Sequence, residues 1–572
     1  MFYPGQLSEA LRVSAAWFAI LAPGLLLAQR HLSFLYVSAR VSVGAGASYA
    51  LFSYLAYLDT LCFGLGKTMP WLWLGLVCGS VWHCRSMLTP EHLRQAYGAV
   101  RGSRDAKAAA VVFLACFAVR LLPLSCSLLP PGFDPTYHLL LAKIIRTREA
   151  IPPDWQPFEG VARNYPCALH NVLALMNKAW HVDLITAWKS LYPVFGTLTA
   201  ITIFALARDA GEGARRALWI AGAYGLLANL GSLEYYGWGG MVNQAGLFLA
   251  VVMLQLVCAL NRLGKHGLHW YFLSGLLFTV AFMTHHHVML SCGLMLLTVA
   301  GASFLFCRGE GLYKYVVLSL AASALLGCPQ LLPMLGKLGT VGKTGLMTFV
   351  EEYYGLAKLF CSMGPAFLIA SAVGMPLVAR NYRDSRGLPV VACLICLVGG
   401  FVVLEYAWQG YYYLSHGVRQ TPFVPSRFLT NGVVFLAFPA GLFFDRFFTV
   451  AWARSRLAVL AVACLLAWQT AGYVKALCTN VVGPDEYNAL TWIRDNTPSD
   501  AYIINNSRWV PFFCWRETAF TPLSASEPGA GSRPERHDAI ILQSGRPVYL
   551  MGAGLGYALA FEAGAYSVYR VK

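Results

Sequence analysis

The stretch Gly132-Phe133-Asp134-Pro135-Thr136-Tyr137-His138 directly follows an apolar stretch, Ala108 to Leu129. That apolar stretch is long enough to cross a membrane, which takes about 20 residues. Asp134 is therefore an acid at a membrane edge, where charged groups are costly and tend to be functional. A second acid, Glu234, ends another apolar stretch and begins Glu234-Tyr235-Tyr236-Gly237-Trp238-Gly239. Whether the two acids face the same side of the membrane decides what chemistry they can share.

The composition excludes an ordinary soluble protein. Of the 572 residues, 57% are hydrophobic and 12% are charged, whereas soluble domains carry about 25% charged residues. The 43 Lys and Arg exceed the 27 Asp and Glu, but they fall mostly between apolar stretches rather than on one soluble face. We therefore expect the lipid bilayer, and no nucleic acid, as a partner.

Fourteen apolar stretches are candidates for membrane spans. Their approximate limits are 9–28, 41–63, 69–84, 108–128, 186–207, 216–233, 241–261, 268–284, 287–307, 314–333, 358–379, 388–407, 428–444 and 457–477. Short loops on one side of these spans are rich in Arg and Lys, which places that side in the cytoplasm. We expect a multi-pass protein of the bacterial inner membrane, with both termini and the active site on the external, periplasmic face.

The predicted fold class is an α-helical polytopic membrane protein with about 14 transmembrane helices and a small external α/β domain at the C-terminus. Three parts are predicted: an N-terminal three-span extension (1–107), a transmembrane core with a large external loop at 129–185 (108–479), and the soluble α/β domain (480–572). In the last part a helix begins at Pro484, and strands are expected at 501–504, 539–542 and 548–551.

The residues around Asp134 allow a structural role as well as a catalytic one. Pro135 to Arg148 has the pattern of an amphipathic helix, suited to lying in the membrane interface with its basic side on lipid headgroups. Asp134 would cap this helix, with Pro135 at its first position. His138 lies about one helical turn after Asp134, which adds a second candidate catalytic group.

The Glu234 stretch carries several polar and aromatic candidates. Tyr235 and Tyr236 are typical of an interfacial aromatic belt, which is the structural alternative to a role in a site. Asn243 and Gln244, at the start of the next span, add amides that a lipid-facing helix would avoid. The amides favour a functional site here.

Three consecutive histidines, His285-His286-His287, resemble a metal cluster. Successive helical residues fan out around the axis, so one of them, not all three, would bind a metal or a phosphate. A polar turn at the interface explains them equally well. Glu351 and Glu352 are likewise either site acids or solvated loop residues.

Two arginines are candidates for binding a donor phosphate. Arg427 opens the thirteenth span, where its guanidinium would hold a phosphate bidentately. Arg419 lies earlier in the same loop. The alternative for both is an Arg side chain that reaches the lipid headgroups from a helix end.

These pieces resemble the GT-C superfamily of membrane glycosyltransferases. Asp134-Pro135-Thr136-Tyr137-His138, followed by an amphipathic helix, looks like the first acidic motif of the oligosaccharyltransferase catalytic subunits, and Glu234 is placed like their second. Tyr487 to Pro498 is similar to the segment that opens their external domain. Their Trp-Trp-Asp-Tyr-Gly motif, which reads the acceptor sequon, is replaced here by Asn505 to Pro511, so protein N-glycosylation is not implied.

The resemblance implies transfer of a sugar, with inversion, from a polyprenyl-phosphate or polyprenyl-pyrophosphate donor to a glycan, lipid or protein acceptor. Asp134 would be the general base or a metal ligand, and Glu234 would share the metal or orient the acceptor. Arg427 would offset charge on the departing phosphate, and His138 would assist either partner. A Mg²⁺ or Mn²⁺ ion suits the ligands Asp134, Glu234 and His286, although the sequence does not require one.

Two other functions stay open. A transporter or flippase of a lipid-linked or anionic substrate would show charged residues near mid-span and broken helices in repeated halves. The centres of these spans hold few charges, and no internal repeat is evident. A non-catalytic membrane subunit that binds a glycolipid is the second alternative.

Overall fold

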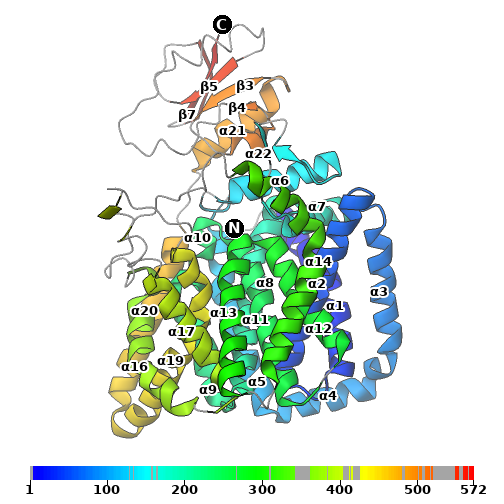
Figure 1. Cartoon of the computed structure of the whole chain (residues 1–572). Helices are drawn as coiled ribbons and strands as arrows, with labels where there is room; N and C mark the ends of the chain where they lie inside the picture. The colour runs from blue at the N-terminus through cyan, green and yellow to red at the C-terminus, as the bar shows by residue number, and fades with distance from the viewer. Residues whose placement is uncertain are drawn as a thin grey trace.

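The computed structural model of the chain shows a body of helices with a smaller strand-containing part at one end (Figure 1). The structure describes residues 4–127, 129–132, 134–155, 159–162, 165–265, 267–307, 311–341, 361–382, 384–403, 411, 414–415, 425–478, 483–499, 501–505, 509–515, 517–518, 548–552, 558–563 and 566–571. The end of the body that carries the strands is called the upper end below, and the opposite end the lower end.

Nine helices within these described ranges are long and apolar enough to cross a membrane. They are α1 (Pro4–His31), α2 (Val37–Cys62), α5 (Arg104–Leu121), α8 (Leu184–Asp209), α11 (Met241–Arg262), α13 (His286–Phe306), α14 (Leu312–Val341), α19 (Pro425–Arg454) and α20 (Arg456–Leu477). The other predicted spans coincide with shorter helices: α3 (Met69–His83), α9 (Ala214–Gly222), α12 (Leu268–Thr284), α16 (Pro365–Asn381) and α17 (Leu388–Val402). The multi-pass helical class is confirmed, and the count of fourteen spans stays a prediction.

Helices α8 and α11 form the centre of the body. In their most apolar windows 89% and 94% of the residues are buried, against 6% in α20, which lies at the edge. Helix α8 packs against α2, α5, α9 and α11, and α11 also packs against α12. Any side chain carried by α8 or α11 near the upper end is therefore held within the body rather than facing lipid.

The N-terminal helices pack closely into this body. Helices α1 and α2 approach so closely that a Cβ on Gly24 would lie 2.2 Å from the carbonyl oxygen of Gly44, as small residues allow between membrane helices. Helix α2 also contacts α7 (Ala168–Trp180), α8, α11 and α12. The domain boundary after residue 107 stays a prediction.

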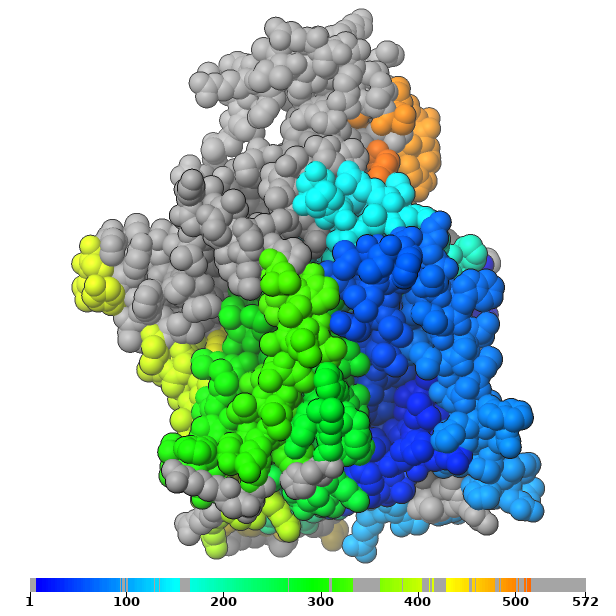
Figure 2. Space-filling model, turned by 45° about the vertical axis from the view of Figure 1, so that its right-hand side comes forward, coloured from blue at the N-terminus to red at the C-terminus, as the bar shows by residue number. Residues whose placement is uncertain are grey.

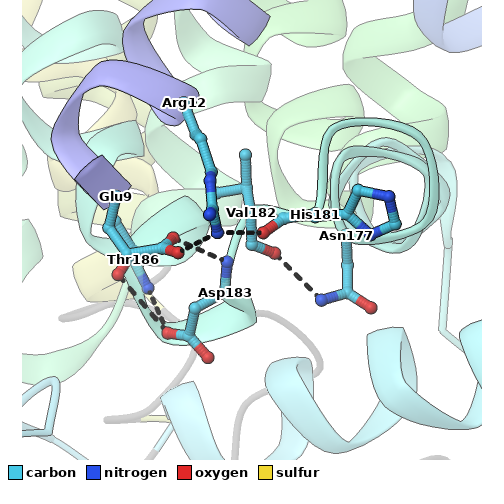
Figure 3. Close-up of polar contacts among 7 residues, drawn as sticks. All are labelled: Glu9, Arg12, Asn177, His181, Val182, Asp183 and Thr186. Atoms are coloured by element: carbon cyan, nitrogen blue, oxygen red, sulfur yellow. Dashed lines mark hydrogen bonds and ion pairs between the residues drawn. The ribbon is translucent and has the colours of Figure 1, made fainter. Parts of the chain in front are cut away.

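The start of α1 is tied to the turn between α7 and α8 (Figure 3). Arg12 pairs with Glu9 at 2.8 Å and donates to the carbonyl of His181 at 3.5 Å. Glu9 also accepts the backbone N–H of Asp183 at 3.1 Å. His181 ends α7 in the left-handed conformation, with φ of 52°, and Asp183 caps α8 by accepting the N–H of Thr186 at 3.0 Å.

Helix α6 (Asp134–Arg148) lies across the upper end, between the N-terminal helices and the tail. In Figure 2 the cyan part of the chain lies between the blue helices and the orange part. The predicted amphipathic helix is present, but the predicted lipid contact is wrong for Lys143. This side chain donates to the carbonyl of Phe512 and lies over the rings of Phe512 and Trp515, at 5.2 Å and 4.8 Å. The contacts place α6 beneath α22 (Val510–Cys514).

The described tail holds a five-stranded sheet in the order β4-β3-β5-β7-β6. The strands are β3 (Tyr502–Asn505), β4 (Glu517–Thr518), β5 (Val548–Gly552), β6 (Ala558–Ala563) and β7 (Tyr566–Val571), and a separate hairpin pairs β1 (Asp154–Trp155) with β2 (Glu159–Ala162). Strand β3 is parallel to β4 and β5, whereas β7 is antiparallel to β5 and β6. Helix α21 (Pro484–Asn496) packs on β6 and β7. The predicted strand at 539–542 lies outside the described residues, and an independent α/β domain stays a prediction.

The remaining short elements complete the two ends. At the lower end, η1 (Arg85–Leu88) and α4 (Pro90–Gly102) join α3 to α5. At the upper end, η2 (Leu122–Ser125) follows α5, and α10 (Tyr235–Trp238) precedes α11. Figure 1 places α6, α7 and α10 at the upper end and α4 and α9 at the lower end. The segments that follow α5 and precede α11 are thereby brought to the same end of the body.

Replacing Asp183 with Ala should lower the free energy of unfolding by about 1 kcal/mol, because α8 loses the carboxylate that caps it. Asp183→Ser is the matched control, since Ser caps a helix about as well. The unfolding midpoints of both variants in detergent measure the difference. Equal midpoints for the Ala and Ser variants would contradict the capping role.

Candidate functional site

The segments that carry Asp134 and Glu234 are packed directly against each other. Gly132 has φ of 90°, and a Cβ there would lie 2.4 Å from the carbonyl carbon of Trp238. Gly239 has φ of 88°, and a Cβ there would lie 2.2 Å from Cδ of Pro135. Neither position has room for a side chain, because Gly132 lies against the backbone of Trp238 and Gly239 lies against the ring of Pro135. The structure thus brings the two predicted acidic motifs together at the upper end.

Asp134 lies in the first turn of α6, which begins one residue earlier than predicted. Asp134 is half-buried, and its neighbour Pro135 is buried against Gly239. The N-terminus of a helix carries partial positive charge, which favours the ionised form of a carboxylate. Asp134 therefore has a defined place at the start of α6.

A broken helix positions Glu234. The apolar stretch 216–233, predicted as one span, contains α9, then two π-helical turns, η3 (Ala223–Leu227) and η4 (Asn229–Leu233). The chain is extended at Ala228, and Gly231 has φ of 71°. The backbone N–H of Glu234 bonds to the carbonyl of Asn229 at 3.0 Å. Local π-helical turns occur often at functional sites. Glu234 directly follows the second turn, η4, at the upper end.

Arg120 clamps this broken helix from α5. Its side chain is fully buried. The guanidinium donates to the carbonyl of Gly225 at 2.9 Å and to Oγ of Ser232 at 2.7 Å, and lies 5.6 Å from the ring centre of Tyr192. A Cβ on Gly196 would lie 2.2 Å from Nε of Arg120, so α8 needs a glycine there. Within the described residues no carboxylate pairs with Arg120, and its role is to satisfy polar groups that the break leaves unpaired inside the membrane body.

A buried hydrogen-bond network anchors the residues after Glu234. Nδ2 of Asn243 donates to Oη of Tyr235 and to Oδ1 of Asn431, both at 2.7 Å. Nδ2 of Asn431 donates to Oγ of Ser291 at 2.6 Å. The network joins α10, α11, α13 and α19. It gives Tyr235 and Asn243 a positioning role, and Asn431 is a member that the sequence analysis missed.

The interfacial aromatic belt, the structural alternative for Tyr235 and Tyr236, does not describe them, because both side chains are buried in the body. Oη of Tyr236 forms a hydrogen bond of 2.7 Å with Oγ of Ser127, in the segment that leads to Asp134. Gln244 is also fully buried, and its side-chain amide has no hydrogen-bond partner among the described residues. These three residues of α10 and α11 are therefore packed inside the body directly after Glu234 in the chain.

A cluster of histidines surrounds Tyr165 beside α6. Nδ1 of His138 lies 2.9 Å from Nε2 of His170, and the ring of His138 stacks on Trp188 with ring centres 5.3 Å apart. The ring centre of Tyr165 lies 5.1 Å from that of His138 and 5.6 Å from that of His286.

The structure therefore brings His138 close to the predicted His285-His286-His287 turn, where the ring of His285 also contacts Tyr165 at 6.0 Å. Sequence spacing gave no signal for His170 or Tyr165, which lie in the segment 129–185 with His138 but join the cluster only in the fold.

The predicted metal set is not assembled. Among the side chains that the structure describes, no group of three or more His, Cys, Asp or Glu residues could hold a metal ion. Asp134, Glu234 and His286 therefore do not form a ligand group, and we derive no step through a metal.

Several predicted residues are not placed. Glu351, Glu352 and Arg419 lie outside the described residues. Arg427 lies in the first turn of α19, near the predicted start of that span, and its side chain is not described. Arg427 lies four positions before Asn431, about one helical turn along α19. This places the backbone of Arg427 one turn from the network that holds the Glu234 segment.

Replacing Gly239 with Ala should lower the free energy of unfolding by about 1–3 kcal/mol beyond the cost of positive φ alone, since the new Cβ overlaps the Pro135 ring. Gly211→Ala is the matched control, because Gly211 has φ of 96° and no atom within 4 Å of its Cβ position. The unfolding midpoints of the two variants in detergent measure the loss of stability in each. Equal losses for the two variants would contradict the contact.

Replacing Arg120 with Lys should loosen the segment 223–238, because an ammonium group cannot reach Gly225 and Ser232 in the geometry of a guanidinium. Hydrogen exchange should rise in that segment, with a loss of about 1–3 kcal/mol of stability. Arg101→Lys, an exposed change at the lower end, is the control. Unchanged exchange at 223–238 in the Arg120 variant would show that Arg120 does not hold the break.

No protein family model and no curated protein sequence matches this chain. Solved structures do match its fold. ArnT from Cupriavidus metallidurans bound to undecaprenyl phosphate aligns with a TM-score of 0.55 and 14% identity, over 81% of this chain and 97% of that chain. The Archaeoglobus fulgidus oligosaccharyltransferase tethered with an acceptor peptide containing the NVT sequon aligns with a TM-score of 0.51 and 14% identity. The alignment covers 77% of this chain and 69% of that chain.

A structure of AglB from Archaeoglobus fulgidus with an inhibitory peptide and a dolichol-phosphate gives a TM-score of 0.51 at 13% identity, over the same shares of the two chains. These enzymes are GT-C glycosyltransferases. The sequence resemblance carried by the Asp134 and Glu234 segments is thereby confirmed at the level of architecture, and the chain has the fold of the GT-C membrane glycosyltransferases.

Proposed function

We propose that this protein is a membrane glycosyltransferase that moves a sugar from a polyprenyl-linked phosphate or pyrophosphate donor to an acceptor hydroxyl at its upper end. The observation that carries the proposal is the direct packing of the Asp134 segment on the Glu234 segment. The fold supports it, because the similar structures include one bound to undecaprenyl phosphate and one with a dolichol-phosphate. The upper end would face the external side, as the arginine-rich loops predict.

In the proposed reaction Asp134 is the general base. Its carboxylate accepts the proton of the acceptor hydroxyl as the hydroxyl oxygen attacks the anomeric carbon. The bond from that carbon to the donor phosphate oxygen breaks, and its electron pair leaves with the lipid phosphate. Attack opposite the leaving group inverts the anomeric carbon. Asp134 belongs to the first turn of α6, and a base in a defined place suits a hydroxyl that must attack in one orientation.

Glu234 would orient the acceptor in this scheme. It reaches the upper end through the broken helix and is followed at once by Tyr235, which the amide network holds in place. Two carboxylates of fixed position allow one to take the proton while the other accepts a second hydrogen bond from the acceptor. His138 is assigned to positioning of α6, because its Nδ1 is within hydrogen-bond distance of His170 and its ring is stacked on Trp188.

The donor phosphate would be met by Arg427 at the start of α19, with Arg419 as the second candidate. A guanidinium stabilises charge that grows on the phosphate as the sugar leaves, and such stabilisation is larger in the transition state than in the ground state. The support is the position of Arg427 in α19, four residues before Asn431, whose side chain joins the network that holds Tyr235.

Replacing Asp134 with Asn should reduce sugar transfer by about 10²–10⁴-fold, the range for loss of a general base. Asn keeps the size of the side chain and is equally compatible with a helix start, so insertion and the unfolding midpoint should stay unchanged. Transfer is measured in a strain lacking the gene and carrying each variant, as mature surface glycan and as accumulated polyprenyl-linked sugar.

Asp154→Asn is the matched control, because Asp154 lies in the same outer segment and pairs with Arg148 at 3.4 Å. The control should transfer normally. Normal glycan and no accumulated donor in the Asp134→Asn strain would reject Asp134 as the base. Loss of transfer in that strain, with normal membrane insertion and normal donor binding, supports the enzyme over a transporter or a glycolipid-binding subunit.

A further inference from the structure

A cavity of about 350 Å³ lies at the lower end, away from the Asp134 site, between the first turn of α9, the last turn of α16 and the C-terminal half of α19. Four guanidinium groups and one carboxylate line it: Arg215, Arg216, Arg380, Arg446 and Asp445. Figure 1 shows α9 at this end of the body. The proposed glycosyl transfer makes no use of these residues.

The cavity has more positive than negative charge. Asp445 is buried and pairs with Nε of Arg215 at 2.8 Å and with Nε of Arg216 at 3.3 Å. Arg216 is further balanced by Glu212 at 3.1 Å. No ion pair within the described residues involves Arg380 or Arg446, the other two arginines of the lining. The buried carboxylate therefore fixes one wall, and two guanidinium groups remain to bind an anion.

The walls of the cavity are firmly packed. The ring of Trp219 in α9 stacks on Phe448 in α19, with ring centres 4.7 Å apart and planes 9° apart. Oγ of Ser371 in α16 donates to the carbonyl of Leu436 in α19 at 3.1 Å. A Cβ on Gly374 would lie 1.9 Å from the carbonyl oxygen of Pro439. A site that is already formed binds its ligand without the cost of ordering its walls.

The lining also contains apolar side chains, Leu377, Leu442 and Val450. Guanidinium groups bind phosphate oxygens in pairs of hydrogen bonds, and basic pockets between membrane helices suit anionic lipid headgroups. A free phosphate ion would use the arginines and leave the apolar wall unused, whereas a phospholipid uses both. We infer that this cavity binds the phosphate headgroup of an anionic phospholipid at the end of the body opposite Asp134.

The full chain, purified in neutral detergent and stripped of lipid, tests the inference by native mass spectrometry with added dioleoylphosphatidylglycerol. Wild type should bind one lipid in a saturable way. Arg380→Gln/Arg446→Gln should raise the half-saturating lipid concentration about 30-fold, the effect of two basic side chains beside an anionic headgroup. Arg101→Gln/Arg104→Gln removes two exposed charges outside the cavity and should bind like wild type.

Dioleoylphosphatidylcholine and inorganic phosphate are the comparison ligands. Weaker binding of phosphatidylcholine, with little competition from millimolar phosphate, supports the anionic lipid. Competition by phosphate at equal concentration would assign the cavity to a free phosphate and overturn the lipid. Equal lipid binding by wild type and the cavity variant would overturn the site. An unchanged unfolding midpoint shows that the variant is folded, and so separates loss of the site from loss of structure.

Discussion

The contact of Gly132 with Trp238 and of Gly239 with Pro135 is the constraint on which the rest of the upper end depends. Two segments that are about a hundred residues apart in the chain meet at these glycines, which leave no room for a Cβ on either segment. The contact constrains the path of both backbones. Each glycine also has a positive φ, which other residues rarely adopt, so the local conformation is constrained as well. The backbone segments that carry the two acids are therefore fixed relative to each other by this contact.

The path of each backbone is in turn fixed from inside the body. On one side, α6 is buried beneath α22 and over α7. On the other side, the helix before Glu234 is interrupted, and an interruption inside a membrane leaves carbonyl and N–H groups that lipid cannot satisfy. Arg120, Ser232 and the π-helical turns satisfy them. A buried guanidinium is costly to place in a membrane body, so its presence here indicates that the shape of the break is needed.

The sequence was sufficient to predict a multi-pass helical protein, because apolar length is a local signal, and the role of the two acids stays a prediction. Apolar length predicts the spans, and an acid at the end of an apolar stretch predicts a site at the membrane edge. Arg120 also had a local signal, because it is a charge inside the apolar stretch 108–129. Its structural role could not be predicted, since that role depends on the break in another helix. His170, Tyr165 and Asn431 had none, since their partners come from distant helices. The burial of Tyr235 and Tyr236 also follows from packing between distant helices. The sequence pattern of an aromatic residue at the end of a span is the same whether lipid or protein covers the side chain.

Helix α19 connects the two ends of the molecule. Asn431 joins the network under Glu234, and Asp445 lies in the arginine cavity, fourteen positions later. At 1.5 Å per residue the two sites are about 21 Å apart along one helix. Coupling between them would need two arrangements of α19, yet α19 is fixed against α16 at Gly374 and against α9 at Phe448. A lipid in the cavity would therefore stabilise the single observed position of α19, and with it the place of Arg427, rather than switch the site between states.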